Sequence, residues 1–338
     1  MLDNRKKKIL QAIVEEYIDT AEPVSSGNLV KELNCSSATI RNEMADLEKN
    51  GFLEKPYTSA GRIPSQKGYR FYIDELLRDD NLTLKEMQYI KERLETTVND
   101  LEDLTKIATT TLSELTHYTT IAIGPKIENH TILDVKFVLL GSRVMMAIIL
   151  TDSGIVREAI IKFDEDVTEE QISKINLLFR NKMVGKPLEE VGGNLEDFII
   201  EEMNNSINII QKIIDEINKI FQENDELFLE GANKSFDLPE FKQADLAKNF
   251  MNVLDEKDLV SDVLSTGVAD DITVYIGDEL HDEKLKDFSV VTFNHILGDK
   301  DIGTIGIIGP KRMDYSKVIS VMKYISKKLK EDYEDEDN

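Results

Sequence analysis

Apolar residues in the first twenty positions recur three and four apart, which is the spacing of one buried helix face. These residues are Ile9, Leu10, Ile13, Val14 and Tyr17. Asp3 can cap this helix, and Pro23 ends it because a proline disfavours helical backbone in the residue before it. A chain that begins in this way has to bury that face against further elements.

Two shorter helices follow directly. The serines at 25–26 can cap the first of them, over 27–34. Ser36 or Ser37 can cap the next, which Gly51 closes as a left-handed C-terminal cap. Two helices joined by a tight turn, after a longer first helix, are typical of a helix-turn-helix.

The outward side of the third helix carries side chains that suit DNA. They are Ser36, Ser37, Thr39, Arg41, Asn42 and Lys49. Arginine can bind guanine and asparagine can bind adenine with two hydrogen bonds each, while short hydroxyl side chains suit phosphates. The alternative is an ordinary exposed helix face, and this helix alone does not decide between the two.

The next stretch of the chain favours DNA binding. A strand at 52–53, a turn at 58–62 and an extended segment at 63–64 form a hairpin, the wing of a winged helix. Arg62 at the tip suits a phosphate or the minor groove, and Gly61 permits a close backbone approach. Further donors around the wing are Lys55, Tyr57, Ser59, Lys67 and Arg70. A basic loop needed only for solubility is a poor alternative, because the rest of the protein is acidic.

The net charge of −24 is distributed unevenly along the chain. Residues 1–78 hold 12 basic and 12 acidic side chains, and the other 260 residues hold 29 basic and 53 acidic ones. A strongly acidic protein repels nucleic acid unless one surface is locally positive. Between Lys49 and Tyr72 there are five basic residues and one acid, Glu54. The N-terminal segment is therefore where we expect DNA to bind.

No arrangement of residues supports catalysis, a cofactor or a metal site. The four histidines are scattered, and the single cysteine, Cys35, excludes an intrachain disulfide and a Cys-cluster zinc site. The glycines at 303, 306 and 309 match neither dinucleotide-binding nor phosphate-loop patterns. The longest apolar run, 144–150, is too short to span a bilayer, and no secretory signal is visible. We expect a non-enzymatic, cytoplasmic protein without a membrane partner.

The middle of the chain alternates helical stripes with strand patterns. A Thr-x-x-Glu capping box at 83–86 starts a heptad-like stripe that runs to residue 115, and a second stripe covers 200–221. Each stripe fits packing within one chain as well as a dimer seam. Three antiparallel strands are expected within 132–163, and a helix after Thr168.

The residue pattern in the last third of the chain predicts a further sheet with helices. A strand at 226–231 and a helix near 246–264 precede three strands, at 271–277, 288–297 and 303–310, and a final helix at 315–329. Helices packed on one antiparallel sheet indicate an α+β fold, so we predict an α+β multidomain protein. The tail, 331–338, has six acids in eight residues and is expected to be disordered.

One long block resembles the signature of HrcA, a family of heat-inducible transcription repressors of bacteria: residues 36–74, SSATIRNEMADLEKNGFLEKPYTSAGRIPSQKGYRFYID. The resemblance continues in LFLEGANKSF from residue 227 and GPKRMDYSKVISVM from residue 309, and covers essentially the full length. It implies a GAF-like domain interrupted by an inserted dimerisation unit. The implied division is 1–78 for the winged-helix DNA-binding domain, 83–119 with 221–330 for the GAF-like domain, and 120–220 for the insert.

The resemblance also implies a function in the heat-shock stress response. A homodimer would repress chaperone operons by binding an inverted-repeat operator in double-stranded DNA, and a chaperonin would keep the repressor active. As an alternative, a metabolite bound in the GAF-like domain would set the affinity for DNA. A third possibility, an adaptor whose winged helix binds protein, fits the basic stretch at 49–72 poorly.

Overall fold

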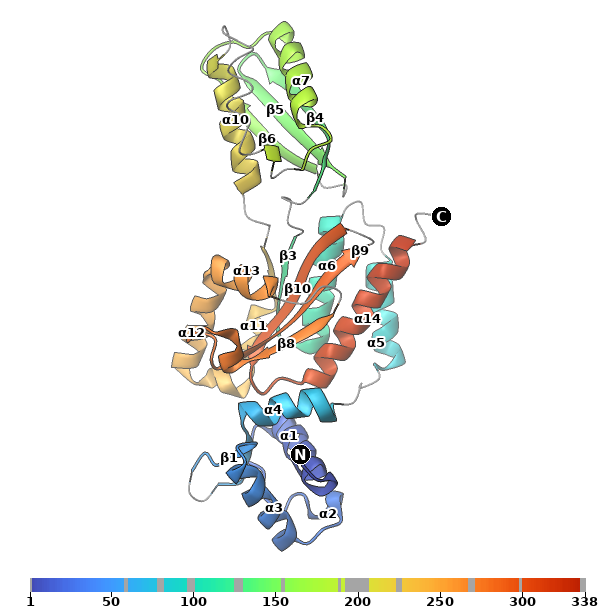
Figure 1. The fold of residues 1–338 in the computed structure, drawn as a ribbon, viewed down its shortest axis with the longest axis vertical. Coiled ribbons are helices and arrows are strands. Elements are labelled where there is room, and N and C mark those ends of the chain that lie inside the picture. The colour runs from blue at the N-terminus through green and yellow to red at the C-terminus, as the bar shows by residue number, and fades with distance from the viewer. Residues whose placement is uncertain are drawn as a thin grey trace.

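Three units follow one another along the longest axis of the molecule (Figure 1). The computed structural model describes residues 2–57, 60–77, 82–95, 101–124, 130–152, 156–187, 190–191, 207–222, 227–266, 271–297 and 300–334. Within these ranges, the strands form a two-stranded hairpin, a five-stranded sheet and a three-stranded sheet. Antiparallel sheets with packed helices confirm the predicted α+β class.

The N-terminal unit contains the predicted helix-turn-helix, made of α1 (Asn4–Thr20), α2 (Val30–Leu33) and α3 (Ser37–Lys49). The carboxylate of Asp3 caps α1 by accepting hydrogen bonds from the backbone N–H groups of Arg5 and Lys6, and the hydroxyl of Ser36 caps α3 by accepting from the backbone N–H of Thr39. Gly51, at a φ of 78°, takes the left-handed conformation expected after α3.

The predicted wing is confirmed as a short antiparallel hairpin. β1 (Leu53–Glu54) pairs with β2 (Ile63–Pro64). After the hairpin, α4 (Gln66–Phe71) continues into one π-helical turn, η1 (Tyr72–Leu76). Figure 1 places α4 between the helix-turn-helix and the central unit, so this helix is the part of the N-terminal unit that meets the rest of the protein.

The central unit is built on the five-stranded sheet, with the order β7-β3-β10-β9-β8 and antiparallel neighbours throughout. Its strands are β3 (Thr119–Ile123), β7 (Leu227–Glu230), β8 (Ile272–Ile276), β9 (Phe288–Leu297) and β10 (Lys300–Pro310). On one face lie α6 (Leu101–Thr116) and α14 (Tyr315–Glu334), with α5 (Leu84–Leu94) beside them. The other face is covered by α12 (Ala244–Asp255) and α13 (Lys257–Ser265). Three short elements complete the unit: α11 (Ala232–Ser235), η3 (Pro239–Lys242) and η4 (Gly277–Leu280).

The outer unit is the three-stranded sheet, with β5 (Val144–Thr151) between β4 (Ile132–Gly141) and β6 (Val156–Lys162). Helices α7 (Glu169–Met183) and α10 (Ile207–Gln222) pack on one face of it, around a core that includes an edge-to-face pair of Phe137 and Phe179 rings. These elements confirm the three strands and the helix after Thr168 that the sequence predicts, and Thr168 forms a capping box with Gln171.

Three predicted helices differ in the structure. The stripe from 83 to 115 is divided between two helices, α5 and α6. In a single helix, 25 residues would separate Tyr89 from Glu114 by about 37 Å, yet both Tyr89 and Arg93 contact Glu114. The helix near 246–264 breaks at Glu256, whose backbone is not helical. The final helix runs on to Glu334, so part of the tail expected to be disordered is helical.

The predicted boundary at residue 120 is also wrong. It falls inside β3, which pairs with β10 and β7 and therefore belongs to the central sheet. We propose that the insert begins after Gly124 and ends with α10. The remaining boundaries stay proposals: 1–78 for the winged helix, and the segments on either side of the insert for the GAF-like domain.

Candidate nucleic-acid interface

The outward face of α3 presents side chains that the protein itself leaves unused. Arg41, Asn42 and Lys49 are exposed, and in the described part of the chain none of them takes part in a hydrogen bond or an ion pair. Ala38 and Ala45 lie exposed on the same helix and add little bulk to it. A helix with small residues and free cationic and amide groups can enter the major groove and read base edges.

The hydroxyl groups at the start of α3 are already engaged. The Oγ of Ser36 accepts from the backbone N–H of Thr39 at 3.1 Å and lies 2.9 Å from the Oγ1 of Thr39. The Oγ of Ser37 lies 2.9 Å from the Oγ of Ser26, which belongs to the turn before α2. These hydroxyls hold the turn of the helix-turn-helix, and Ser36 and Thr39 keep a further lone pair each for a phosphate or a water.

The acids of α3 are neutralised by cations from outside it. Glu43 lies 3.6 Å from both Arg5 and Lys6, and Asp46 lies 3.3 Å from Lys6. The hydrogen bond with Asp46 raises the pKa of Lys6. No role was predicted for these cations, although the basic run at 5–8 stands out in the sequence. Because the acids are paired, they oppose DNA less than their number suggests.

Arg62 does not lie free at the tip of the wing, as the sequence suggested. Its guanidinium binds one carboxylate oxygen of Glu48 through Nε at 2.7 Å and through a terminal nitrogen at 2.6 Å. Its backbone exchanges two hydrogen bonds with Val24, and a Cβ on Gly61 would lie 2.3 Å from the carbonyl oxygen of Val24. The close approach that requires Gly61 is therefore to Val24, within the protein. Arg62 clamps the wing to α3.

Two more predicted DNA ligands are used elsewhere. The ammonium group of Lys67 donates to the carbonyl oxygen of Asn50 at 2.9 Å and lies 4.5 Å above the centre of the Phe52 ring, so it caps the end of α3. Arg70 points away from the helix-turn-helix: its Nε donates to Glu279 at 3.0 Å and a terminal nitrogen donates to the carbonyl oxygen of Val274 at 2.6 Å. These two partners belong to the central unit, and the other terminal nitrogen of Arg70 pairs with Asp74 in η1 at 3.2 Å.

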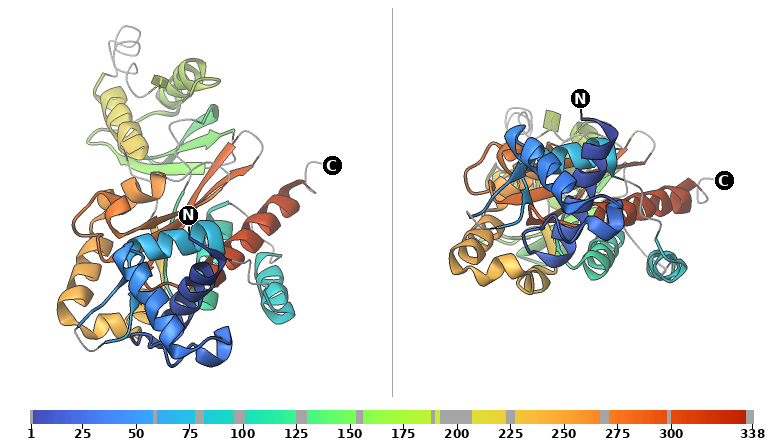
Figure 2. Two further views of the ribbon diagram at one scale, coloured as in Figure 1. Left: turned by 60° about the horizontal axis from the view of Figure 1, so that its bottom comes forward. Right: turned by 90° about the horizontal axis from the view of Figure 1, so that it is seen from below.

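The side chains left for a partner form a smaller set than predicted. It contains Arg41, Asn42 and Lys49 on α3, and Lys55 and Tyr57 on the wing, where the Tyr57 side chain is 61% exposed. Ser59 lies outside the described residues. Figure 1 shows α3 at the end of the molecule far from the central sheet, and the view from below in Figure 2 shows the N-terminal unit in front of the other two. DNA therefore has a route to this face.

The central unit offers no large cavity between α13 and the sheet. The cavity there measures about 10 Å³ and is lined by apolar side chains that include Val260, Leu264 and Ile307. A space of that size holds about one water molecule. This cavity therefore has no room for a metabolite. A larger pocket of the same unit, about 380 Å³, is lined by residues of β8, β9 and α14 that include Phe293 and Lys327.

The described ranges contain neither a candidate metal site nor a candidate membrane-spanning helix. Within them, His, Cys, Asp and Glu side chains form no group of three or more that could hold a metal ion. No helix in the same ranges combines the length and the apolar character needed to cross a membrane.

Comparison with known proteins agrees with the geometry. Residues 102–319 match the family model described as HrcA protein C terminal domain, and residues 9–70 match one described as HTH domain. The heat-inducible transcription repressor HrcA of Ruminiclostridium cellulolyticum is 42% identical over 339 residues, covering 98% of this chain and 97% of that protein. The protein of the same name from Acetivibrio thermocellus is 39% identical with the same coverage.

Among solved structures, one titled as the crystal structure of a hypothetical protein at 2.2 Å resolution is similar over 98% of both chains. It is 26% identical to this chain, with a TM-score of 0.64. The fold and the comparisons agree on the same class of protein. The chain contains a helix-turn-helix and antiparallel sheets, and it aligns with curated repressors over nearly its full length. This chain belongs to the HrcA family of heat-inducible transcription repressors, which are not enzymes.

Proposed function

We propose that this protein represses heat-shock operons by binding an inverted-repeat operator as a homodimer. The single observation that carries the proposal is the state of α3. Its three acids are paired with Arg5, Lys6 and Arg62, whereas Arg41, Asn42 and Lys49 have no ion pair or hydrogen-bond partner among the described residues. An acidic protein thus keeps one face on which cations and an amide are available to a duplex.

The roles of the free side chains follow from their chemistry. Arg41 and Asn42 lie in the first half of α3, where a recognition helix meets base edges, so we assign them base reading. Lys49 at the end of α3, with Lys55 and Tyr57 on the wing, suits the phosphate backbone. Repression then needs only that the bound protein excludes polymerase, and no catalytic step is required.

The outer unit offers a surface for the second subunit. Its helices cover one face of the sheet, and the opposite face carries a row of paired residues, Val138, Met146 and Ile160. Ile160 is 58% exposed and Val138 is 36% exposed, and Leu140 on the same strand as Val138 is 54% exposed. The next paired row on this face, Lys136, Ile148 and Glu158, is mixed. Exposed apolar residues in a row on a sheet are typical of an interface, and an inverted repeat requires a two-fold dimer. We therefore propose a homodimer through this face.

We test the dimer with Ile160→Glu, which puts a charge in the centre of the proposed interface. The variant is expected to sediment as a monomer at concentrations where the unchanged protein is a dimer. Leu177→Glu is the matched control, because Leu177 is 64% exposed on α7 rather than on the sheet face. Dissociation caused equally by both variants, or by neither, contradicts the assignment of the sheet face.

The heat response is taken from the family. We propose that a chaperonin in the cytoplasm keeps the repressor competent, and that heat releases the operons when unfolded proteins occupy that chaperonin. The direct experiment is footprinting on the host's chaperone promoters, with and without chaperonin. A protected palindrome that is occupied more fully when chaperonin is present supports the whole proposal. An asymmetric footprint refutes the symmetric dimer, and no footprint at any chaperone promoter refutes the target.

A further inference from the structure

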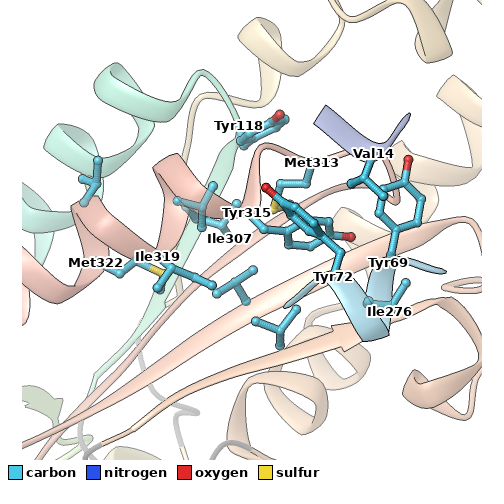
Figure 3. Close-up of a cluster of buried hydrophobic side chains, with 14 of the residues drawn as sticks. Val14, Tyr69, Tyr72, Tyr118, Ile276, Ile307, Met313, Tyr315, Ile319 and Met322 are labelled. Atoms are coloured by element: carbon cyan, nitrogen blue, oxygen red, sulfur yellow. The ribbon is translucent and has the colours of Figure 1, made fainter. Parts of the chain in front are cut away.

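The N-terminal and central units share one apolar core. A single cluster of buried residues runs from α1 through α4 and η1 into the central sheet and α14. Figure 3 shows its middle, where Tyr69 and Tyr72 of the N-terminal unit approach Ile276 and Tyr315 of the central unit. The ring centres of Tyr69 and Tyr315 lie 5.9 Å apart. The two units therefore pack directly on each other at this contact, which we call the seam. Beside the packed part lies a pocket of about 590 Å³ that is lined by Gln66, Tyr69 and Arg312.

Arg312 crosses the seam and ends a helix of the other unit. It lies between β10 and α14, and one terminal nitrogen of its guanidinium donates to the carbonyl oxygen of Ile18, in the last turn of α1. Carbonyl groups in the last turn have no partner inside their own helix, and a cation there also suits the helix dipole. α1 has no basic residue in its own last turn. The cap comes from 294 residues further along the chain.

The same guanidinium is held in place from the central unit. Its Nε and its other terminal nitrogen donate to the two carboxylate oxygens of Glu240 in η3, the second at 3.2 Å. The side chain of Arg312 is only 10% exposed. An arginine with both ends of its fork occupied and little solvent around it has one orientation, so it transmits the position of η3 to the end of α1.

A second point of attachment lies on α4. Arg70 donates to Glu279 of η4 and to the carbonyl oxygen of Val274 in β8. Four residues before Arg70 in the same helix, Gln66 accepts from the backbone N–H of Asp278 at 3.2 Å. Contacts at α1 and at α4 hold different helices of the N-terminal unit. Two such points, with the apolar core between them, prevent rotation as well as separation.

We propose that Arg312, with Arg70, positions the recognition helix α3 relative to the dimer and thereby sets the half-site spacing that the repressor accepts. In a two-fold dimer held together by the outer units, the separation of the two α3 helices depends on every joint between α3 and the symmetry axis. A rigid seam fixes the part of that separation that lies between α3 and the central sheet. This inference rests on the proposed function for its effect on operators, but the rigidity of the seam does not depend on DNA.

The first experiment measures the spacing preference of the full-length protein. Operators whose half-sites are moved apart by about 5 bp, half a helical turn, are compared with the natural operator by fluorescence anisotropy. The unchanged protein should bind the lengthened operator about 100-fold more weakly, because one half-site then faces away. Arg312→Gln should reduce this ratio to about tenfold or less, and Arg70→Gln should shift it in the same direction.

The ratio separates positioning from mere stability, since a variant that is partly unfolded loses affinity for both operators alike. Arg143→Gln is the matched control, because it removes an ion pair with Asp166 in the outer unit, away from the seam. An unchanged ratio in both seam variants overturns the proposal. A rise in affinity for the natural operator also overturns it, because the seam would then be a brake on DNA binding.

The second experiment needs no DNA. Spin labels on Lys31→Cys in α2 and Asp262→Cys in α13, in a Cys35→Ser background, report the distance between the two units. We expect one narrow distance distribution, which broadens in Arg312→Gln. A narrow distribution in both proteins refutes the role of Arg312 even if the operator is bound, whereas broadening without any operator binding supports the seam and refutes only the proposed function.

Discussion

The clearest division in the N-terminal unit is between arginines that are free and arginines that are used. We predict opposite outcomes for Arg41→Ala and Arg62→Ala. Arg41 has no partner in the described part of the chain, so its loss should change the free energy of unfolding by no more than about 0.5 kcal/mol. Its loss from the DNA interface should weaken operator binding by about 1–3 kcal/mol, which is about 5- to 150-fold, and relax the base preference at one position.

Arg62→Ala should act first on stability. The substitution removes two short charge-assisted hydrogen bonds to Glu48 and leaves that carboxylate without its cation. The two side chains are 18% and 36% exposed, so solvent weakens the pair, and we expect a loss of about 1–2 kcal/mol from the free energy of unfolding. DNA of any sequence should then be bound more weakly, because an unpaired acid remains on α3 and the wing is less fixed.

Two assays on the same variants test whether Arg41 acts on DNA binding and Arg62 on stability. Chemical or thermal unfolding gives the stability of each variant, and anisotropy with operator and random duplexes gives the specificity. Arg143→Ala in the outer unit controls for the loss of a surface arginine. The division fails if Arg41→Ala destabilises the protein as much as Arg62→Ala does, or if Arg62→Ala alone abolishes the difference between operator and random DNA while the stability is unchanged.

Two further predictions concern the central unit and the seam. The hydrogen bond from Lys317 lowers the pKa of Glu86 from 4.5 to about 2. This contact therefore stabilises the fold above pH 4.5, and the stabilisation is lost as the pH falls toward 2. Glu86→Gln should flatten that part of the curve of unfolding free energy against pH, and an unchanged curve refutes the assignment. The hydroxyl of Tyr69 is buried without a hydrogen-bond partner in the described part of the chain, and such a group costs about 1–3 kcal/mol. Tyr69→Phe should therefore raise the melting temperature, and a lower melting temperature would show that the hydroxyl has a partner such as a bound water.

The pairing of charges explains how an acidic protein can present a face to DNA. The charges that matter for DNA binding are those close to α3. Glu43 and Asp46 lie within 4 Å of cations from α1, while the bulk of the negative charge belongs to the central and outer units. Figure 2 shows those units behind the N-terminal unit when the molecule is seen from below. At physiological ionic strength charges are screened over about 8 Å, so the local balance on α3 matters more than the net charge.

The sequence by itself determined the elements whose signals are local. Spacing of apolar residues, capping residues and turn glycines placed α1, α3 and the wing, because each depends on residues a few positions apart. The same signals placed the strands of the outer sheet and those of the central sheet except β3. The free residues of α3, Arg41 and Asn42, were found in the same way, since helix geometry alone turns them outward from Ile40.

Only the tertiary structure decided which cations are free and which are fixed. Nothing near Arg62, Lys67 or Arg70 in the sequence distinguishes them from a DNA-contacting arginine or lysine, yet their partners are Glu48, Asn50 and Glu279. The break between α5 and α6 and the place of β3 in the central sheet were equally invisible, because they depend on residues far apart in the chain. Long-range contacts assign a charged side chain to the protein or to its partner, and local patterns carry no information about them.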